Sequence, residues 1–457
     1  MSLKIAYYAD DFTGSTDALE FLTREGARTV LFVEPPSREQ LARYGKLDAI
    51  GVAGLTRSMA PERMEERLLE DFARLEALEP RHVHYKVCST FDSSPKIGNI
   101  GQAIEAGLRV FKNSMVPLVV GAPALGRYVA FGNLFARLGI GSRGNIYRLD
   151  RHPSTSRHPV TPMTEADLMR HLARQTDKRM GLIDFTQLES GEADSALQGL
   201  KADGCEVVFF DTLNPSHLEV IGRLLDSEAN GSCLFSVGSS GVEAALGSLW
   251  AEDGLLAGAN DFESLRERKD LLVISGSCSP VTGEQIDRAI SDGFAAVSLD
   301  TSLLVDAEGY RKEISRAVEE AVSYLAEERP TIVHSAKGPE DPRIDRTEAA
   351  FARVGVGPDS LKERSGALFG GALGEIAREC IQRTGIKRLL VSGGDSSSYA
   401  ARAMGIEAVE MIAPLVAGAP ICRAHAPDSP LDGVEVNFKG GQVGGKAYFS
   451  QVAKGCL

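Results

Sequence analysis

Short apolar runs alternate with longer amphipathic stretches along most of the chain, and this alternation limits the fold more than any other feature. The runs that read as β-strands in the first half are Lys4–Ala9, Thr29–Val33, Asp48–Val52, His82–Val87, Pro117–Gly121, Val207–Asp211 and Cys233–Val237. The stretches with helical spacing between them include Ser15–Gly26, Pro61–Leu78 and Ile100–Phe111. Continuous apolar strands separated by helices are typical of a mostly parallel sheet covered on both faces. We therefore predict an α/β fold.

A chain of 457 residues is too long for one ordinary core, so two domains are expected. The sequence AEDGLLAGANDFESLRERKD after Trp250 is small and charged, which is typical of a connection. The pattern then begins again, with strands at Leu271–Ser275, Thr331–His334 and Arg388–Val391 and a helix at Pro280–Ile290. We predict domains at residues 1–250 and 265–457 and an active site in the cleft between them. Residues 335–365 carry no assignment.

Charge and cysteine content narrow the classes of partner. The formal net charge of -13 and the pI near 5.3 argue against nucleic-acid binding, because no basic stripe offsets the acids. The seven cysteines are dispersed and form no C-x-x-C pair, which indicates reduced thiols in a cytoplasmic protein. No signal sequence and no apolar run of membrane-spanning length is evident, so no membrane association is expected. A small anionic ligand and a homo-oligomer both stay open.

Two adjacent acids, Asp10 and Asp11, stand where the first strand ends, in the sequence YYADDFTGSTDALEF. Ligands of open α/β sheets bind beyond the carboxyl ends of the strands, so this loop is a candidate site. Ser15 or Thr16 could cap the helix that follows, and the alternative to a site is that Asp11 merely caps the helix or closes a turn. Like charges this close need a cation, a basic partner or a shared proton, which favours a functional role for the pair.

A second candidate loop, HYKVCSTFDSSPKIGNIGQAI, follows the strand that ends near Lys86. Lys86, Ser89, Thr90 and Asp92 would suit a polyhydroxylated anion, because the lysine can pair with a carboxylate and the others can bond to hydroxyls. A Ser- and Asp-rich turn without function is the alternative. Arg57 follows another strand and is a similar, individually weaker candidate.

Two Gly/Ser-rich loops in the second half indicate nucleotide binding. LLVISGSCSPVTGEQI combines a strand, a tight loop and a helix with Pro280 in its first turn, and free N–H groups at such a helix start suit phosphate. RLLVSGGDSSSYAARAMGI repeats the design with the loop 393–396. Gly393 and Gly394 let the backbone approach a ligand closely, and Asp395 could hold Mg²⁺ or orient a phosphate.

The sequence GGQVGGK at 440–446 fits the spacing of a P-loop, yet Ala447 stands where that motif needs Ser or Thr, and only ten residues follow. We therefore reject a Walker motif. The glycines could still cover a nucleotide, and a plain hairpin is the alternative.

The Arg- and His-rich stretch 148–168 contains no metal-binding spacing, and His152 and His158 flank prolines as residues of an ordered loop do. A structural role is the favoured interpretation. If the loop is functional, Arg151 or Arg157 could meet an acid. The chain has no G-x-S-x-G motif, and the stretch with G-x-G-x-x-G spacing, GIGSRG (139–144), does not lie between a predicted strand and a predicted helix, which weakens hydrolase and dehydrogenase interpretations.

Five motifs together resemble the four-carbon acid sugar kinases. They are ADDFTGSTDALE (9–20), KVCSTFDSSPKIGNIG (86–101), RHPVTPM (157–163), SGSCSPVTGEQI (275–286) and VSGGDSSSYAA (391–401). The resemblance covers nearly the whole chain and implies an N-terminal domain that binds a sugar acid and a C-terminal domain that binds ATP with Mg²⁺. It implies phosphorylation of a terminal hydroxyl of threonate, erythronate, a 3-oxo-tetronate or the branched 3-oxoisoapionate. GRYVAFGNLFARLG (126–139) is similar to only some branches, and Ser15 stands where most members have Ala.

The resemblance also implies site residues. The residues expected at the substrate are Asp10, Asp11, Thr13, Arg57, Lys86, Ser89, Thr90 and Asp92, and those expected at the nucleotide are Ser275, Ser277, Gly393, Gly394, Asp395, Ser396 and Gly441, with Asp395 also near the metal. Phosphoryl transfer needs positioning, charge neutralisation and an acceptor for the hydroxyl proton. The hypothesis is that Asp10 or Asp11 accepts this proton when the domains close.

Two rival classes stay open on the residues alone. A sugar-acid lyase or isomerase could use the same carboxylates without a nucleotide, and a two-lobed binding protein could hold the sugar acid without chemistry. Neither rival needs the paired Gly/Ser loops of the second half, so nucleotide binding separates them from the kinase.

Overall fold

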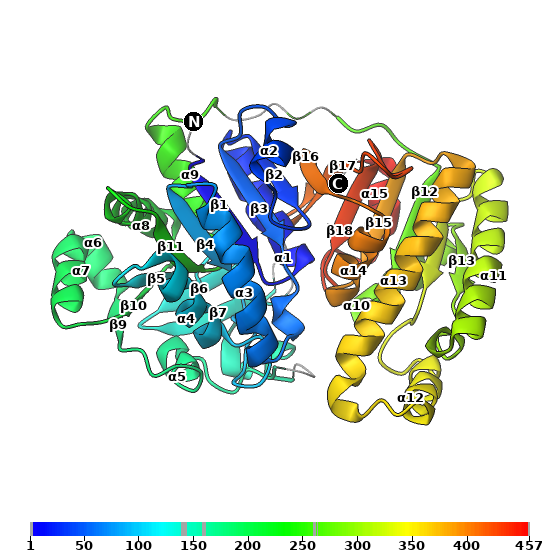
Figure 1. Ribbon diagram of the computed structural model, residues 1–457, viewed down its shortest axis with the longest axis horizontal. Coiled ribbons are helices and arrows are strands. Elements are labelled where there is room, and N and C mark those ends of the chain that lie inside the picture. Colours follow the sequence, from blue (N-terminus) through cyan, green and yellow to red (C-terminus); the bar gives the residue numbers. More distant parts are fainter. Residues whose placement is uncertain (1–2, 139–143, 158–160, 259–261, 263, 456–457) are drawn as a thin grey trace. The chain divides into compact units, whose positions relative to one another are not determined.

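The computed structural model describes residues 3–138, 144–157, 161–258, 262 and 264–455. The chain forms two compact units, residues 1–260 and 261–457. Each unit is an α/β structure with a mostly parallel sheet, so the predicted fold class is correct (Figure 1).

The first unit contains one large sheet in the strand order β2-β3-β1-β4-β11-β5-β10-β9. Its strands are β1 (Ile5–Ala9), β2 (Thr29–Phe32), β3 (Ala49–Ala53), β4 (His82–Lys86), β5 (Val116–Val119), β9 (Met180–Ile183), β10 (Val207–Phe210) and β11 (Leu234–Gly238). All of the pairings between them are parallel. The five residues of β1 are all buried, as expected for a strand covered on both faces.

Helices cover this sheet on both faces. The helices of the first unit are α1 (Phe12–Arg24), α2 (Arg38–Ala42), α3 (Pro61–Glu76), α4 (Ile100–Phe111), α5 (Leu168–Leu172), α6 (Phe185–Ser190), α7 (Ala193–Ala202), α8 (Pro215–Glu228) and α9 (Gly241–Glu252). Helix α3 packs beside α4, and α9 packs beside both α1 and α8. Figure 1 shows α3 and α4 on the face of the sheet turned toward the viewer.

A small antiparallel sheet, which the apolar-run pattern did not predict, follows β5. It has the order β6-β7-β8 and consists of β6 (Arg127–Ala130), β7 (Asn133–Arg137) and β8 (Ile146–Arg148). Burial alternates along β7, so one face of this sheet is covered and the other is partly exposed. The only signal in the sequence was an alternation of apolar and polar residues over three to five positions, which is too short to predict a strand.

The second unit has the strand order β13-β14-β12-β15-β18-β17-β16. Its strands are β12 (Leu271–Ser275), β13 (Ala295–Ser298), β14 (Thr331–His334), β15 (Arg388–Ser392), β16 (Ala408–Val416), β17 (Ala419–His425) and β18 (Glu435–Lys439). The pairings along β13-β14-β12-β15-β18 are all parallel, whereas β17 runs antiparallel to its two neighbours, β18 and β16. The sheet is therefore mixed.

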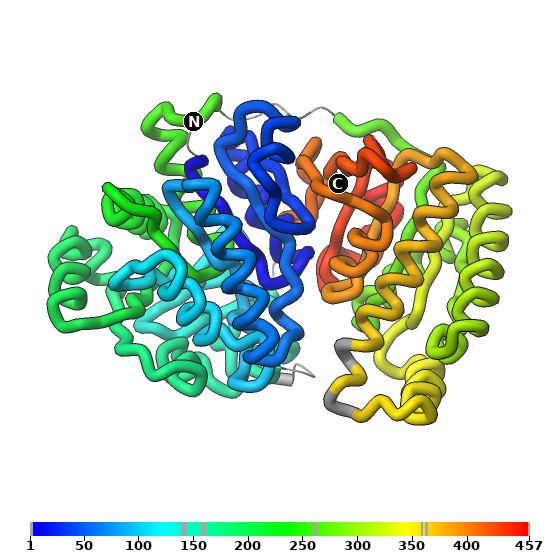
Figure 2. Tube along the Cα trace, viewed as in Figure 1, coloured from blue at the N-terminus to red at the C-terminus, as the bar shows by residue number. Residues whose placement is uncertain are grey.

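The helices of the second unit are α10 (Pro280–Ser291), α11 (Ala307–Ala326), α12 (Arg343–Arg353), α13 (Pro358–Thr384), α14 (Asp395–Ala403) and α15 (Tyr448–Lys454). The unassigned region 335–365 contains α12 and the start of α13. The glycine-rich segment after β18 leads into α15 rather than forming a hairpin, as the red end of the trace in Figure 2 shows. Tyr448, Phe449 and Val452 of α15 join the core formed by β12, β14 and β15.

No helix of the described residues is both long enough and apolar enough to cross a membrane.

Candidate active site

The ends of β1, β3 and β4 lie side by side and bring the first candidate residues together. Ala9 pairs in register with Ala53 on one side and with Lys86 on the other. The backbone continues this arrangement beyond the strands, because Asp10 N donates to Lys86 O at 2.9 Å and Arg57 N donates to Asp10 O at 3.1 Å. The sheet therefore sets Asp10, Arg57 and Lys86 at one carboxyl edge.

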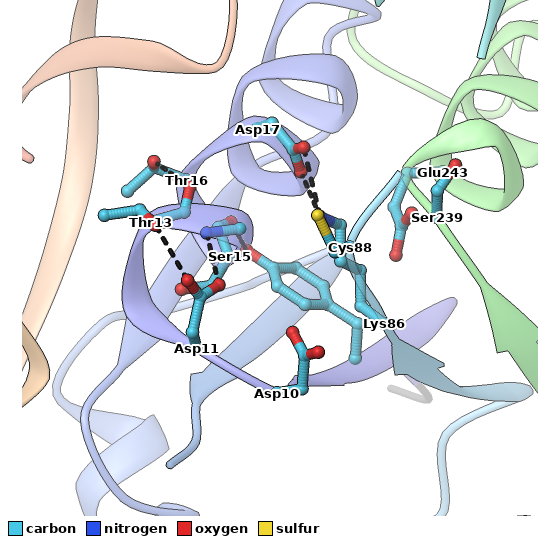
Figure 3. Close-up of polar contacts among 12 residues, drawn as sticks. Asp10, Asp11, Thr13, Ser15, Thr16, Asp17, Lys86, Cys88, Ser239 and Glu243 are labelled. Atoms are coloured by element: carbon cyan, nitrogen blue, oxygen red, sulfur yellow. Dashed lines mark hydrogen bonds and ion pairs between the residues drawn. The ribbon is translucent and has the colours of Figure 1, made fainter. Parts of the chain in front are cut away.

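Asp11 is the N-cap of α1. Its Oδ1 accepts from Gly14 N at 2.7 Å, and its Oδ2 accepts from Thr13 Oγ1 at 2.8 Å (Figure 3). The prediction that Ser15 or Thr16 caps this helix is wrong: both hydroxyls donate to carbonyls of the first turn instead. A cap of this kind satisfies backbone donors that the helix cannot pair internally.

Arg57 joins the two acids. Its Nη2 and Nε bind the two oxygens of Asp10 at 2.7 and 3.1 Å, and its Nη1 binds Oδ2 of Asp11 at 2.6 Å. An arginine of the chain itself therefore bridges the two acids and offsets part of their charge, and a basic partner is one of the solutions expected for like charges in contact. Burial raises the pKa of Asp10 to about 6, with the charge of Arg57 opposing this shift and that of Asp11 adding to it.

Lys86 already has a carboxylate partner within the chain. Its Nζ lies 2.9 and 3.0 Å from the two oxygens of Asp17, a residue of α1, and the lysine is buried (Figure 3). A Cβ at Gly14 would stand 3.2 Å from Lys86 Nζ and 3.4 Å from Arg57 Nη2, so both cations lie against the first turn of α1. Asp17 was not among the predicted site residues, because its position along α1 does not by itself distinguish it from a surface acid.

The loop after β4 holds the other predicted substrate residues close together. Ser89 and Thr90 are buried, Thr90 Oγ1 donates to Asp92 Oδ1 at 3.0 Å, and Phe91 has a φ of 56°. A non-glycine residue in the left-handed region is uncommon and is held there by its surroundings. The contact of Ser93 Oγ with His171 Nε2, at 2.9 Å, fixes the far side of this loop.

Behind Lys86 lies a buried pair that the sequence did not indicate, His84 and Glu243. His84 Nε2 is 3.7 Å from Glu243 Oε1, and neither carboxylate oxygen of Glu243 has a hydrogen-bond partner among the described residues. Burial raises the pKa of Glu243 to about 8, and burial together with the charge of Lys86 lowers the pKa of His84 to about 3. Near pH 7 both groups are therefore neutral, and the contact is not an ion pair.

The predicted nucleotide residues of the second unit also come together, from three loops. A Cβ at Gly276 would stand 2.4 Å from Ser396 Oγ, and one at Gly441 would stand 2.7 Å from Ser277 Oγ. Gly393 has a φ of 151°, and a Cβ at this position would stand 2.2 Å from Ser396 Oγ. The loops after β12, β15 and β18 thus require glycine where they meet.

Several features of the region where the loops after β12, β15 and β18 meet suit the binding of a phosphate group. Ser275 Oγ and Ser279 Oγ are buried and have no hydrogen-bond partner among the described residues. Neither α10 nor α14 has a side chain that caps its N-terminus. A Cβ at Gly394 would meet nothing within 4 Å, so space is open beside the start of α14. Free N–H groups and unpaired hydroxyls around open space form an anion site.

Lys439 lies beneath these loops, and sequence reasoning did not identify it. Its Nζ donates to Thr282 Oγ1 at 3.1 Å, Gln285 Oε1 at 2.8 Å and Ser392 Oγ at 3.2 Å, and burial lowers its pKa to about 7. Cys278 of the loop after β12 also lines a cavity of about 130 Å³, together with residues that include Thr301, Thr347, Phe351 and Phe369.

The donor set for Mg²⁺ in the second unit is small. The described residues contain no group of three or more His, Cys, Asp or Glu side chains that could hold a metal. Mg²⁺ at kinase sites is held through substrate phosphates, waters and one or two carboxylates, so the carboxylate of Asp395, in the first turn of α14, fits this mode of binding.

The Arg- and His-rich stretch has a structural part. His152 is buried, and its Nδ1 accepts from Ser154 N at 3.2 Å and Thr155 N at 3.3 Å. Arg151 is exposed. The side chain of Arg157 and all of His158 lie outside the described residues.

Comparisons with known proteins identify the family. The sequence profile of a sugar-binding N-terminal domain matches residues 5–246, and that of a nucleotide-binding C-terminal domain matches residues 272–449. The chain belongs to the four-carbon acid sugar kinase family.

Among its curated relatives, a 3-oxo-isoapionate kinase of Paraburkholderia graminis is 41% identical over 100% of this chain and 95% of the relative. A 3-oxo-tetronate kinase of Methylobacterium radiotolerans is 33% identical over 99% of both chains. Crystal structures of proteins from Salmonella typhimurium and Haemophilus influenzae share the fold, with TM-scores of 0.73 and 0.68 at 24% identity; they cover 98% of this chain and 98% and 99% of their own.

Proposed function

We propose that this chain transfers the γ-phosphoryl group of ATP to a terminal hydroxyl of a 3-oxo sugar acid. The observation that carries the proposal is Asp10, a buried carboxylate at the carboxyl end of β1 whose pKa is raised to about 6. A general base works best when its pKa lies near the working pH. Residues 1–250 would bind the sugar acid and residues 265–457 would bind ATP.

Asp10 and Asp11 would have different roles. Asp10 would accept the proton of the attacking hydroxyl, because among the described residues its two oxygens bind only the Arg57 side chain and each retains a further lone pair. Asp11 is committed to Gly14 N, Thr13 and Arg57, and we assign it the positioning of Arg57 and of the start of α1. Arg57 would hold both acids in place.

The nucleotide would lie along the loops after β12, β15 and β18. Ser275, Ser277 and the 393–396 backbone would bind its phosphates, with Gly441 allowing the close approach of the third loop. Asp395 would hold Mg²⁺, which when bound supplies charge neutralisation to the phosphates. The described cysteines are free thiols, which fits a cytoplasmic enzyme.

Two substrates are the first to test. The relative named for 3-oxo-isoapionate is 41% identical to this chain and the one named for 3-oxo-tetronate is 33% identical, so we place the branched acid first. Both are 3-oxo acids with a terminal hydroxyl, and one chemistry serves both.

An ADP-release assay over a panel of 3-oxo-isoapionate, 3-oxo-tetronate, threonate and erythronate tests the proposal. We expect ADP release with at least one of the acids and about 10²- to 10⁴-fold slower release by Asp10→Asn. ADP with Mg²⁺ should also raise the melting temperature. A protein that neither turns over any of the acids nor responds to ADP would refute the proposal and leave a nucleotide-independent lyase, isomerase or binding protein as the alternatives.

A further inference from the structure

The two cations predicted at the substrate site, Arg57 and Lys86, are already paired with carboxylates of the chain. Arg57 is engaged by Asp10 and Asp11, and Lys86 is engaged by Asp17. These five side chains carry three negative and two positive formal charges. A sugar acid that entered beside them would meet net repulsion unless a further cation took its carboxylate.

Arg127 is a buried cation without a carboxylate partner. It opens β6, it is 7% exposed, and it forms no ion pair with any described residue. Its Nη1 donates to three backbone carbonyls, those of Leu125 at 3.2 Å, Gly126 at 3.3 Å and Arg137 at 3.2 Å. Buried arginines are rare unless they are paired, because the desolvation of the charge is costly.

The other edge of this guanidinium has no hydrogen-bond partner among the described residues. Nε is buried and has no hydrogen-bond partner among the described residues, and Nη2 donates no hydrogen bond to them either. Nε and Nη2 together present two parallel N–H groups, the fork that binds both oxygens of a carboxylate. The three carbonyl bonds to Nη1 hold the fork in one orientation.

Arg127 also lies close to the substrate loop. Burial lowers the pKa of Arg127, while the neighbouring Cys88 and Asp92 oppose this shift, and both belong to the loop after β4. Burial and the charge of Arg127 lower the pKa of His152, so the arginine also lies near the Arg- and His-rich stretch. Because β4 and β5 are parallel strands of one sheet, the segments that follow them emerge at the same edge.

We propose that Arg127 binds the carboxylate of the sugar-acid substrate through Nε and Nη2 and thereby makes the enzyme selective for acids over neutral sugars. This inference rests on the proposed function, and it gives the β6–β8 sheet a role in substrate selection. The competing explanation is that Arg127 only ties the β5–β6 connection to β7 through its three carbonyl bonds.

The two explanations differ in what they predict for a neutral substrate. Erythrulose has the carbon skeleton, 3-oxo group and terminal hydroxyl of 3-oxo-tetronate but carries CH₂OH in place of the carboxylate. Wild-type enzyme should prefer the better of the two 3-oxo acids over erythrulose by about 100-fold in kcat/KM. Arg127→Gln should lose about 100-fold on the acid, mainly through KM, and less than about threefold on erythrulose.

Two further variants sharpen this test. Arg127→Lys keeps the charge and loses the fork, so its loss on the acid should be intermediate. Arg151→Gln removes an exposed arginine of the neighbouring stretch and should retain the preference of the wild type. Equal losses on acid and erythrulose, or loss of acid preference in Arg151→Gln instead, would overturn the assignment. If Arg127→Gln fails to fold, Arg127→Lys decides by the same ratio.

A binding measurement separates this inference from the kinase proposal. In the absence of ATP, the 3-oxo acid should raise the melting temperature of the wild type and not that of Arg127→Gln. Stabilisation of both proteins by the acid would overturn the role of Arg127, whatever the turnover. Stabilisation of the wild type alone, without ADP release for any acid, would support Arg127 and refute the kinase.

Discussion

Glu243 offers the sharpest quantitative test of the electrostatics around the candidate site. The side chain is fully buried on α9 beside His84, with Lys86 and Asp17 as the neighbouring charges. The variant Glu243→Gln replaces a neutral carboxylic acid by a neutral amide of nearly the same shape, so it removes a titration and little else. Any fixed difference in hydrogen bonding is independent of pH.

The pKa of Glu243 sets the expected magnitude. An ordinary value of 4.5 in the unfolded chain and about 8 in the folded protein mean that the folded state binds the extra proton between these pH values. Stability therefore falls as pH rises through this window, by about 1.4 kcal/mol per pH unit and by about 5 kcal/mol in all. Glu243→Gln should gain about 4 kcal/mol relative to the wild type between pH 5 and pH 8.

Because His84 also titrates, the difference in unfolding free energy between wild type and Glu243→Gln is more informative than the pH dependence of either protein alone. Its lowered pKa means that the wild type loses stability as pH falls below about 6.5, which opposes the Glu243 effect in that range. The effect of His84 is present in both proteins and cancels in their difference.

Trp250 makes the measurement direct. It is the single tryptophan of the chain, it is buried, and it lies on the same helix as Glu243, so its fluorescence reports the unfolding of the first unit in urea. Glu252→Gln, an exposed change on that helix, is the matched control and should stay within about 0.5 kcal/mol of the wild type. A difference between Glu243→Gln and the wild type that does not change with pH would mean that Glu243 is ionised in the folded protein, and would refute the reasoning.

The remaining predictions concern the two proposed binding regions. In the wild type, kcat/KM should fall as the pH drops below about 6, the pKa of Asp10, and Asp10→Asn should lose this pH dependence together with most of the turnover. Asp11→Asn keeps a good N-cap and should lose less turnover. Equal losses of turnover in the two variants, measured as pH–rate profiles, would contradict their different roles. Lys439→Met should raise KM for ATP by about tenfold with a small change in kcat, and an unchanged KM would remove the lysine from the nucleotide region. Gly393→Ala should destabilise the protein by about 1–3 kcal/mol because of its φ of 151°, while Gly394→Ala, with open space around it, should cost less in urea denaturation.

The sequence was sufficient for the parallel sheets because their strands are apolar on both faces. Ile5–Ala9 and Leu271–Ser275 are buried throughout, so each appears as a continuous run. Strands that are buried on one face, such as β7 and Ala408–Val416, leave only an alternating pattern over a few residues, and they were not assigned.

The candidate site was predictable where residues follow a strand directly, and not where a partner arrives from elsewhere. Asp10 stands out because it ends β1, and Lys86 because it ends β4. The pairing of Lys86 with Asp17 depends on how α1 packs. Arg127 and Lys439 were missed because a basic residue in a sequence is by default a surface residue, and only the folded structure reveals its burial.

The contacts of Gln285 have a consequence for building chimeras between relatives. Its amide Nε2 donates to the carbonyls of Val443, Gly444 and Gly445, while its Oε1 accepts from Lys439. The loop after β18 is therefore fastened by a helix that lies more than 150 positions earlier in the chain. A loop transplanted from another family member would lack these hydrogen bonds unless the matching part of α10 were transferred with it. The two segments should therefore be exchanged together.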